Sequence, residues 1–84
     1  MRYHLTITRR AQQELGNLPS DVYERVRDAI FSLADNPRPR GCARLHGREG
    51  WRIRVGRYRV IYEIEDEQGM VTVLRVGPRR DVYR

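Results

Sequence analysis

The residues best suited to chemistry are three arginines on a predicted β-hairpin. In residues 51–62, WRIRVGRYRVIY, hydrophobic side chains alternate with Arg52 and Arg54, and Arg59 takes the matching place after a two-residue turn. Because strand side chains alternate between the two faces of a sheet, we expect the three guanidiniums to converge on one solvent-facing surface. Each guanidinium can grip two phosphate oxygens at once, so this surface predicts binding of nucleic acid.

The charge distribution points the same way. All 17 basic residues are arginine, and the formal net charge is +6 with a pI near 10.4. Residues 1–37 carry five arginines and five acids, whereas residues 38–84 carry twelve arginines and six acids, which accounts for the whole excess. A sequence that simply uses arginine in place of lysine would explain the absence of lysine. It would not explain the clustering, which favours a polyanionic partner.

The first half of the sequence predicts one strand and two helices. Alternating hydrophobic residues indicate a strand over residues 3–7, and Thr8 is placed to cap a short helix over residues 9–17. A second helix is predicted to begin with Ser20 as its N-cap and to be stopped by Asn36-Pro37. Its hydrophobic residues recur at helical spacing and predict one stripe packed on a sheet. These residues are Val22, Val26, Ala29, Ile30 and Leu33.

The second half predicts an antiparallel meander. A proline-containing loop over residues 37–44 leads to a short edge strand around Leu45, then to the hairpin of residues 51–64 and a β-rich run over residues 70–76. The predicted order is β-α-α-β-β-β(-β). We therefore expect a single α+β domain over residues 1–84, with two N-terminal helices packed on one face of a mainly antiparallel sheet.

Several classes of site and location are disfavoured by the sequence. The N-terminus has no hydrophobic run typical of a signal peptide or a membrane span, which predicts a cytoplasmic protein with no membrane partner. Cys42 is the only cysteine, so we expect neither a disulfide framework nor a thiolate metal cluster. The acidic run Glu65-Asp66-Glu67 has the character of a solvated turn, and its spacing predicts no metal site.

Three further side chains could take part in chemistry. His4 and His46 can act as acid or base, but they are far apart in the sequence and neither has a paired carboxylate motif, which disfavours both. Trp51 could stack on a nucleobase, although its alternation with Ile53 and Val55 favours burial in the core.

Two segments and the order of the elements resemble a known family. The segments LHGREGWRIRVGRYRVIYEIED and VLRVGPRRDVYR are similar to toxins of the RelE/ParE superfamily of bacterial type II toxin–antitoxin systems, and in motif they most resemble the RelE-like mRNA interferases. The resemblance implies an antitoxin partner encoded beside this chain, with operator DNA contacted only through that antitoxin. It also implies two possible targets, messenger RNA on the ribosome or DNA gyrase.

For the RelE-like alternative, the resemblance implies a metal-free ribonuclease that needs no cofactor. A ribose 2′-hydroxyl attacks its own 3′-phosphate, basic strand residues hold the phosphate, and a C-terminal arginine and tyrosine assist the leaving group and the nucleophile. By motif position, the catalytic residues implied are Arg52, Arg54, Arg59, Arg79 and Tyr83. From their charge and their place near the arginine face, we also expect nucleic-acid binding by Arg44, Arg48, Arg57, Arg80 and Arg84. Both strand positions are arginine where the best-known RelE enzymes carry lysine, so a lysine proton donor has no counterpart here.

Two other functions are open alternatives to the ribonuclease. A ParE-like gyrase poison would use the basic face as a non-enzymatic interaction surface, and Tyr83 would be a packing residue. An inactive toxin-like module would act only in complex with its antitoxin.

Overall fold

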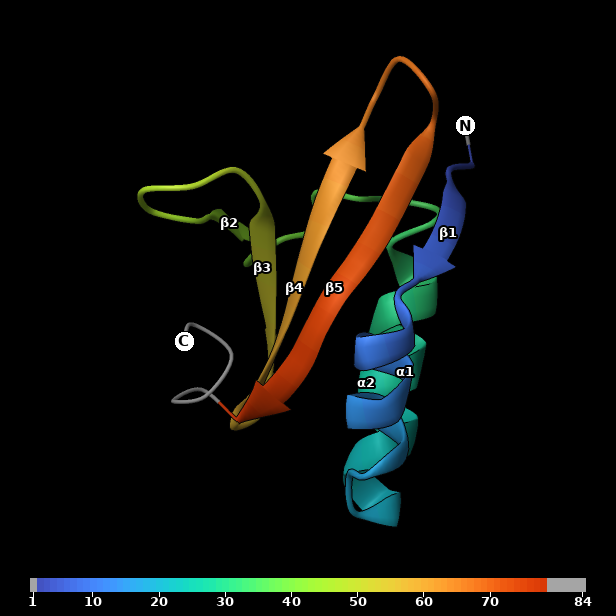
Figure 1. The fold of residues 1–84 in the computed structure, drawn as a ribbon, viewed down its shortest axis with the longest axis vertical. Helices are drawn as coiled ribbons and strands as arrows, with labels where there is room; N and C mark the ends of the chain where they lie inside the picture. Colours follow the sequence, from blue (N-terminus) through green and yellow to red (C-terminus); the bar gives the residue numbers. More distant parts are fainter. Residues whose placement is uncertain (1, 79–84) are drawn as a thin grey trace.

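The computed structural model describes residues 2–78, which form two helices packed on one face of a five-stranded sheet (Figure 1). The strands lie in the order β1-β5-β4-β3-β2; β1 is parallel to β5, and every other neighbouring pair is antiparallel. The element bounds are β1 His4–Ile7, α1 Arg9–Gly16, α2 Ser20–Ser32, β2 Ala43–Arg44, β3 Trp51–Val55, β4 Tyr58–Glu65 and β5 Met70–Pro78. The predicted α+β fold is confirmed.

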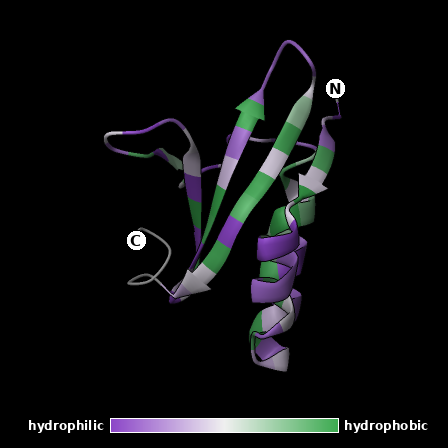
Figure 2. Ribbon diagram, in the orientation of Figure 1, coloured by the Kyte–Doolittle hydropathy of each residue, from purple (hydrophilic) through white to green (hydrophobic). Residues whose placement is uncertain are grey.

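The hydrophobic core lies between the helices and the sheet. The stripe predicted on α2 faces this core, where Val26, Ile30 and Leu33 have no exposed surface. The sheet contributes Tyr62, which is also fully buried and donates a hydrogen bond of 2.8 Å from its hydroxyl to the carbonyl of Pro37. Figure 2 shows hydrophobic and hydrophilic bands alternating along β4 and β5, as expected of strands with one face on the core.

The two helices start differently. Thr8 caps α1 as predicted, because its hydroxyl accepts a hydrogen bond of 3.2 Å from the Ala11 amide. The prediction that Ser20 is the N-cap of α2 is wrong, since the Pro19 carbonyl already accepts the first helical hydrogen bond from Tyr23 at 2.8 Å. Ser20 is therefore the first helical residue and makes no capping bond. Neither helix in residues 2–78 is long and apolar enough to cross a membrane.

The α2 helix ends earlier than Asn36-Pro37. Its last helical residue is Ser32, and the amide of Leu33 donates to the Ile30 carbonyl at 3.0 Å, a tighter turn than an α-helix makes. Turn residues 33–35 separate the end of the helix from Pro37, so this proline does not itself end the helix.

The predicted β3–β4 hairpin is confirmed, with Gly56 in the left-handed region (φ +60°) at its turn. Between β4 and β5 the register shifts: Ile61 pairs with Arg75, but Tyr62 pairs with Val73. The intervening Leu74 is an extra residue on β5, a β-bulge. Because of this bulge, Val73 and Val76 both lie in the core although they are three positions apart.

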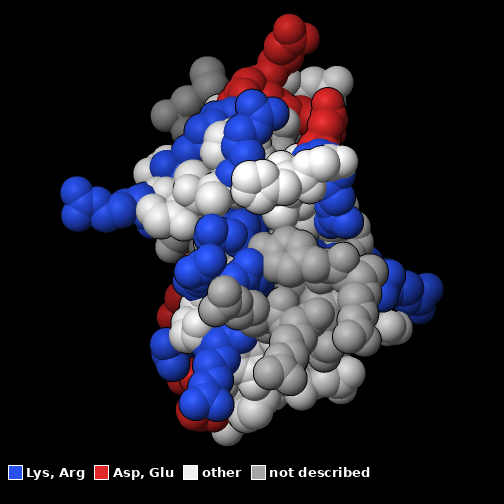
Figure 3. Space-filling view, turned by 90° about the vertical axis from the view of Figure 1, so that its left-hand side faces the viewer, with Lys and Arg blue, Asp and Glu red and all other residues white. Residues whose placement is uncertain are grey.

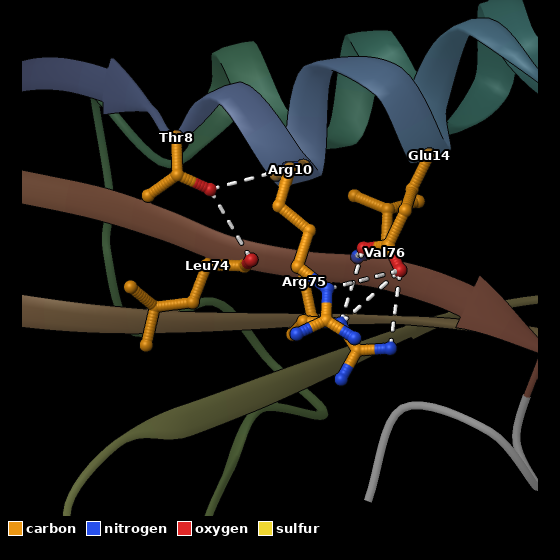
Figure 4. Close-up of polar contacts among 7 residues, drawn as sticks. Thr8, Arg10, Glu14, Leu74, Arg75 and Val76 are labelled. Atoms are coloured by element: carbon orange, nitrogen blue, oxygen red, sulfur yellow. Dashed lines mark hydrogen bonds and ion pairs between the residues drawn. The ribbon is translucent and has the colours of Figure 1, made fainter. Parts of the chain in front are cut away.

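The second half of β5 is covered by α1 where its partner strand β1 has ended. The Glu14 carboxylate accepts a hydrogen bond of 2.9 Å from the Val76 amide and bonds of 3.2 and 3.1 Å from Arg75 Nε (Figure 4). Thr8 reaches the same edge, since its hydroxyl donates to the Leu74 carbonyl at 3.2 Å. These side chains satisfy a strand edge that would otherwise be open to another chain.

Candidate nucleic-acid interface

The predicted arginine face exists and is hollowed. The β3 side chains of Arg52 and Arg54 lie on the sheet face opposite Ile53, which is buried against the core. They line a hollow of about 540 Å³, here called the arginine hollow, between β2, the loop over residues 45–50 and the β3–β4 pair. Its lining residues are Arg44, Arg48, Arg52, Arg54, Arg59 and His46, with Ala43 and Leu45.

Arginine side chains gather on the side of the molecule that carries β2 and β3 (Figure 3). Acidic side chains lie at the upper end of this view, where Figure 1 places the β4–β5 turn, and a few more lie at its lower left edge. No carboxylate lines the arginine hollow within residues 2–78. The hollow is therefore suited to a polyanion, because phosphate oxygens would meet guanidinium donors on several sides.

Arg59 lies deeper than the sequence predicted. It was expected on a solvent-facing surface with Arg52 and Arg54, but only 6% of it is exposed. The reason is its place in the sheet, since β4 is a central strand and Arg59 has Arg54 beside it on β3 and Gly77 beside it on β5. Arg59 thus forms a buried part of the lining of the hollow, and its strand neighbour Arg54 forms an exposed part.

The loop over residues 45–50 closes one side of the hollow and has a defined shape. The Leu45 amide donates to the Gly50 carbonyl at 3.0 Å across the base of the loop. Gly50 has φ +125°, and a Cβ there would lie 3.0 Å from Leu45 Cδ1 and 3.4 Å from the Tyr62 carbonyl oxygen. This backbone conformation favours glycine, and a Cβ would in addition require Leu45 to shift. The loop therefore holds His46 and Arg48 at the hollow that the β3 arginines also line.

A second hollow lies around Trp51, and Arg44 lines both. Arg44 pairs with Trp51 across β2 and β3, and its guanidinium carbon lies 5.4 Å from the centre of the indole ring. The guanidinium carbon of Arg38 lies 5.0 Å from the same ring. This hollow has a volume of about 370 Å³. Trp51 itself is partly buried and packs on the core, as its alternation favoured, while two cation–π contacts occupy its ring.

The acidic turn after β4 is exposed to solvent, as predicted, and one of its carboxylates also holds two segments together. Asp66 accepts hydrogen bonds of 2.8 and 3.1 Å from Arg38 and one of 2.7 Å from the Tyr3 hydroxyl. The guanidinium of Arg38 and then the hydroxyl of Tyr3 lower the pKa of Asp66 to about 2. Asp66 therefore ties the proline loop to the β4–β5 turn and keeps Arg38 over Trp51.

The remaining predicted residues are not brought into the hollow. Arg57 is exposed in the β3–β4 turn and lines neither hollow. Four predicted site residues lie outside the described residues: Arg79, Arg80, Tyr83 and Arg84. Among residues 2–78, no group of three or more histidine, cysteine or acidic side chains could hold a metal ion.

His46 is the lining residue that sequence reasoning disfavoured. It was disfavoured because it lies far from His4 in the sequence and has no paired carboxylate motif, yet the loop brings it to the same hollow as five arginines. The signal available in the sequence was the pair Gly47 and Gly50, because two glycines so close together favour a tight loop that returns to β3. His4, by contrast, lies on β1 at the opposite end of the sheet.

Comparison with known proteins agrees with this fold and arrangement. Residues 5–83 match the family described as the ParE toxin of the type II toxin–antitoxin system parDE. The chain is 34% identical over 86 residues to toxin RelG of Mycobacterium tuberculosis, with 100% of this chain and 99% of RelG covered. It is also similar to two solved complexes. The RelBE2 toxin–antitoxin complex of M. tuberculosis matches with a TM-score of 0.80 and 32% identity, covering 94% of this chain and 100% of the other.

The second solved complex is the archaeal RelE–RelB complex from Pyrococcus horikoshii OT3, which matches with a TM-score of 0.83 and 28% identity, covering 98% of this chain and 100% of the other. The family model spans nearly the whole sequence, and both the sequence relative and the structures align over almost their full lengths. The chain therefore belongs to the RelE/ParE superfamily of toxins of type II toxin–antitoxin systems.

Proposed function

We propose that this toxin is an endoribonuclease that cleaves messenger RNA on the ribosome and so inhibits translation. The observation that carries the proposal is the arginine hollow of about 540 Å³. Of the described residues, five arginines and no acidic side chain line it, from strands and a closed loop. Its similarity to toxins named RelE and RelG supports the same target. Donors fixed in advance around a phosphate suit phosphoryl transfer, because they need no rearrangement as charge develops.

In the proposed reaction, the ribose 2′-oxygen attacks the adjacent phosphorus and the bond to the 5′-oxygen of the next nucleotide breaks. Arg52, Arg54 and Arg59 hold the phosphate and stabilise the added negative charge of the transition state. Arg79 assists the leaving group, and Tyr83 orients or deprotonates the 2′-hydroxyl, as the family resemblance implies. No metal or cofactor is needed, since the nucleophile belongs to the substrate. DNA lacks this hydroxyl and would be left intact.

The other predicted arginines have binding roles in this proposal. Arg44 and Arg48 extend the phosphate-binding surface from the hollow along β2 and the neighbouring loop. Arg57, Arg80 and Arg84 contribute further RNA contacts. A cognate antitoxin is the protein partner, as RelB is in the similar solved complexes, and an acidic segment of it would cover the basic face.

One observation favours a different target. The family model that matches residues 5–83 is that of ParE toxins, and the basic surface around the arginine hollow can also serve as a docking surface for a protein. A ParE-like toxin would poison DNA gyrase without cleaving RNA. Action on messenger RNA yields cut messages, whereas action on gyrase yields DNA breaks, so one experiment distinguishes the two targets.

The test is to induce the wild type and single variants in bacteria and to map new 5′ ends on translated messages within minutes. Arg54→Gln removes an exposed guanidinium from the hollow, and we expect it to reduce cleavage by at least about tenfold. Arg9→Gln removes the same charge from exposed α1 and should cleave like the wild type. Arg79→Ala and Tyr83→Phe should abolish cleavage at matched expression.

The outcomes distinguish the candidate functions. In-frame cuts that depend on Arg54 support the ribonuclease. Growth arrest with gyrase-trapped DNA breaks and no cuts would refute it in favour of the gyrase poison. Equal cleavage by Arg54→Gln and Arg9→Gln would refute the assignment of the hollow as the phosphate site.

A further inference from the structure

We propose that His46 is the proton donor to the leaving group in this ribonuclease. The inference rests on the proposed function and adds a catalytic residue to it. The observation is the placement of His46 in the arginine hollow, opposite the β3 strand that carries Arg52 and Arg54.

The chemistry of the lining residues singles out His46. Among residues 2–78, every other ionisable group that lines the hollow is a guanidinium: Arg44 from β2, Arg48 from the same loop, Arg52 and Arg54 from β3, and Arg59 from β4. Guanidinium stays protonated throughout the physiological range, so it binds and polarises a phosphate but is a poor source of protons. Histidine is the side chain whose charge ordinarily changes between pH 5 and 8, which suits it to give and regain a proton in each turnover.

The backbone of the loop fixes the position of His46. The hydrogen bond from Leu45 to Gly50 closes the base of the loop at 3.0 Å, and Gly47 (φ +75°) and Gly50 (φ +125°) take backbone conformations that other residues rarely adopt. His46 is exposed, and so can reach a bound substrate without moving the core. A histidine on a loop that is fixed at both ends can thus be held beside a phosphate gripped by β3.

The proposed step balances as follows. The 2′-oxygen forms a bond to phosphorus and loses its proton to the phenolate form of Tyr83, which later releases it to water, or to water directly; the product is a 2′,3′-cyclic phosphate. The bond from phosphorus to the 5′-oxygen breaks, and its electron pair stays on that oxygen. The imidazolium of His46 gives its proton to the same oxygen, which leaves as a 5′-hydroxyl. The neutral imidazole then regains a proton from water.

The experiment uses the full chain and a short messenger RNA on programmed ribosomes, with one cut site mapped beforehand. Two substrates are compared in single turnover: the natural link and a link in which sulfur replaces the 5′-bridging oxygen. A thiolate leaves without a proton, so it does not need the donor. His46→Gln should slow cleavage of the oxygen link by about 10²- to 10⁴-fold and restore near wild-type rates with the sulfur link. The matched control His4→Gln should be normal with both.

A pH profile gives a second readout. With the oxygen link, the wild-type rate should fall as pH rises and the donor loses its proton, and this fall should be absent in His46→Gln. Equal loss on both links would mean that His46 positions other groups, and no loss on either would mean that it takes no part, so either result overturns the inference while the ribonuclease stands. A wild type that cleaves neither link overturns the proposed function itself. Unchanged unfolding curves for His46→Gln exclude misfolding as the cause.

Discussion

Glu14 should be among the most important polar side chains for stability, because it satisfies two groups at once on the edge of β5. Its carboxylate accepts from the Val76 amide at 2.9 Å and from Arg75 at 3.1 to 3.2 Å. The Arg75 side chain is 15% exposed and that of Glu14 is 24% exposed, so water replaces these bonds poorly. Glu14→Ala would leave a backbone donor and a largely buried guanidinium without their acceptor.

The expected cost follows from these contacts. A hydrogen bond to a charged group contributes about 1.5–3 kcal/mol, and leaving a buried donor unsatisfied costs a similar amount. Because both groups keep some access to water, we expect Glu14→Ala to lower the free energy of unfolding by about 2–4 kcal/mol. For a domain of this size that corresponds to a fall in Tm of roughly 10–25 °C. Glu14→Gln keeps an acceptor for Val76 but loses the charge, and should cost about half as much.

The assay is urea unfolding followed by circular dichroism, with Tm from thermal unfolding. Arg10→Ala is the control, since Arg10 also approaches Glu14, at 3.9 Å, but its side chain is 66% exposed; it should change the free energy of unfolding by less than about 0.5 kcal/mol. A loss below about 0.5 kcal/mol for Glu14→Ala would refute the reasoning. So would an Arg75→Ala, Glu14→Ala double variant whose two effects simply add.

Two other predictions concern the surroundings of the hollows. Arg38 and Tyr3 lower the pKa of Asp66 from 3.8 to about 2, so Asp66 stabilises the fold above pH 3.8 and loses that contribution as pH falls towards 2. Unfolding curves of the wild type and Asp66→Asn should differ at pH 6 and converge near pH 2; a difference that is constant with pH would contradict the ion pair. Gly50→Ala forces a Cβ to 3.0 Å from Leu45 at φ +125° and should cost about 1–3 kcal/mol. It should also weaken RNA binding in a filter assay, and unchanged stability and affinity would show that the loop adapts.

Local pattern predicted most of the fold. The alternation in residues 51–64 predicted β3, β4 and their turn, and helical spacing predicted the buried face of α2, because neighbours in sequence determine these features. The Ser20 cap was wrong because a serine after a proline fits two helix starts that differ by one residue. The bulge at Leu74 could not be predicted, since it depends on how β5 meets β4.

At the site, alternation predicts the face of the sheet on which a side chain lies. It does not predict how deeply the side chain is buried or which residues it contacts. Arg52 and Arg54 share the open face as predicted, but the depth of Arg59 follows from the position of β4 in the middle of the sheet. Arg44 lies beside Trp51 because β2 pairs in that register, and His46 enters the hollow because the loop folds back. These are long-range facts that a single sequence does not contain. The catalytic and RNA-binding roles stay predictions.

The pairing of β1 with β5 has a consequence for folding of the chain during its synthesis. His4 lies opposite Met70, so the first strand finds its neighbour only when the last described strand has been made. Arg59 likewise has β5 on one side, through Gly77. A chain still emerging from its ribosome can form local hairpins and helices but cannot yet assemble the centre of the sheet. The sheet that carries the arginine hollow is therefore complete only after β5 has been made, and until then a partner protein could bind the strands that lack their neighbours.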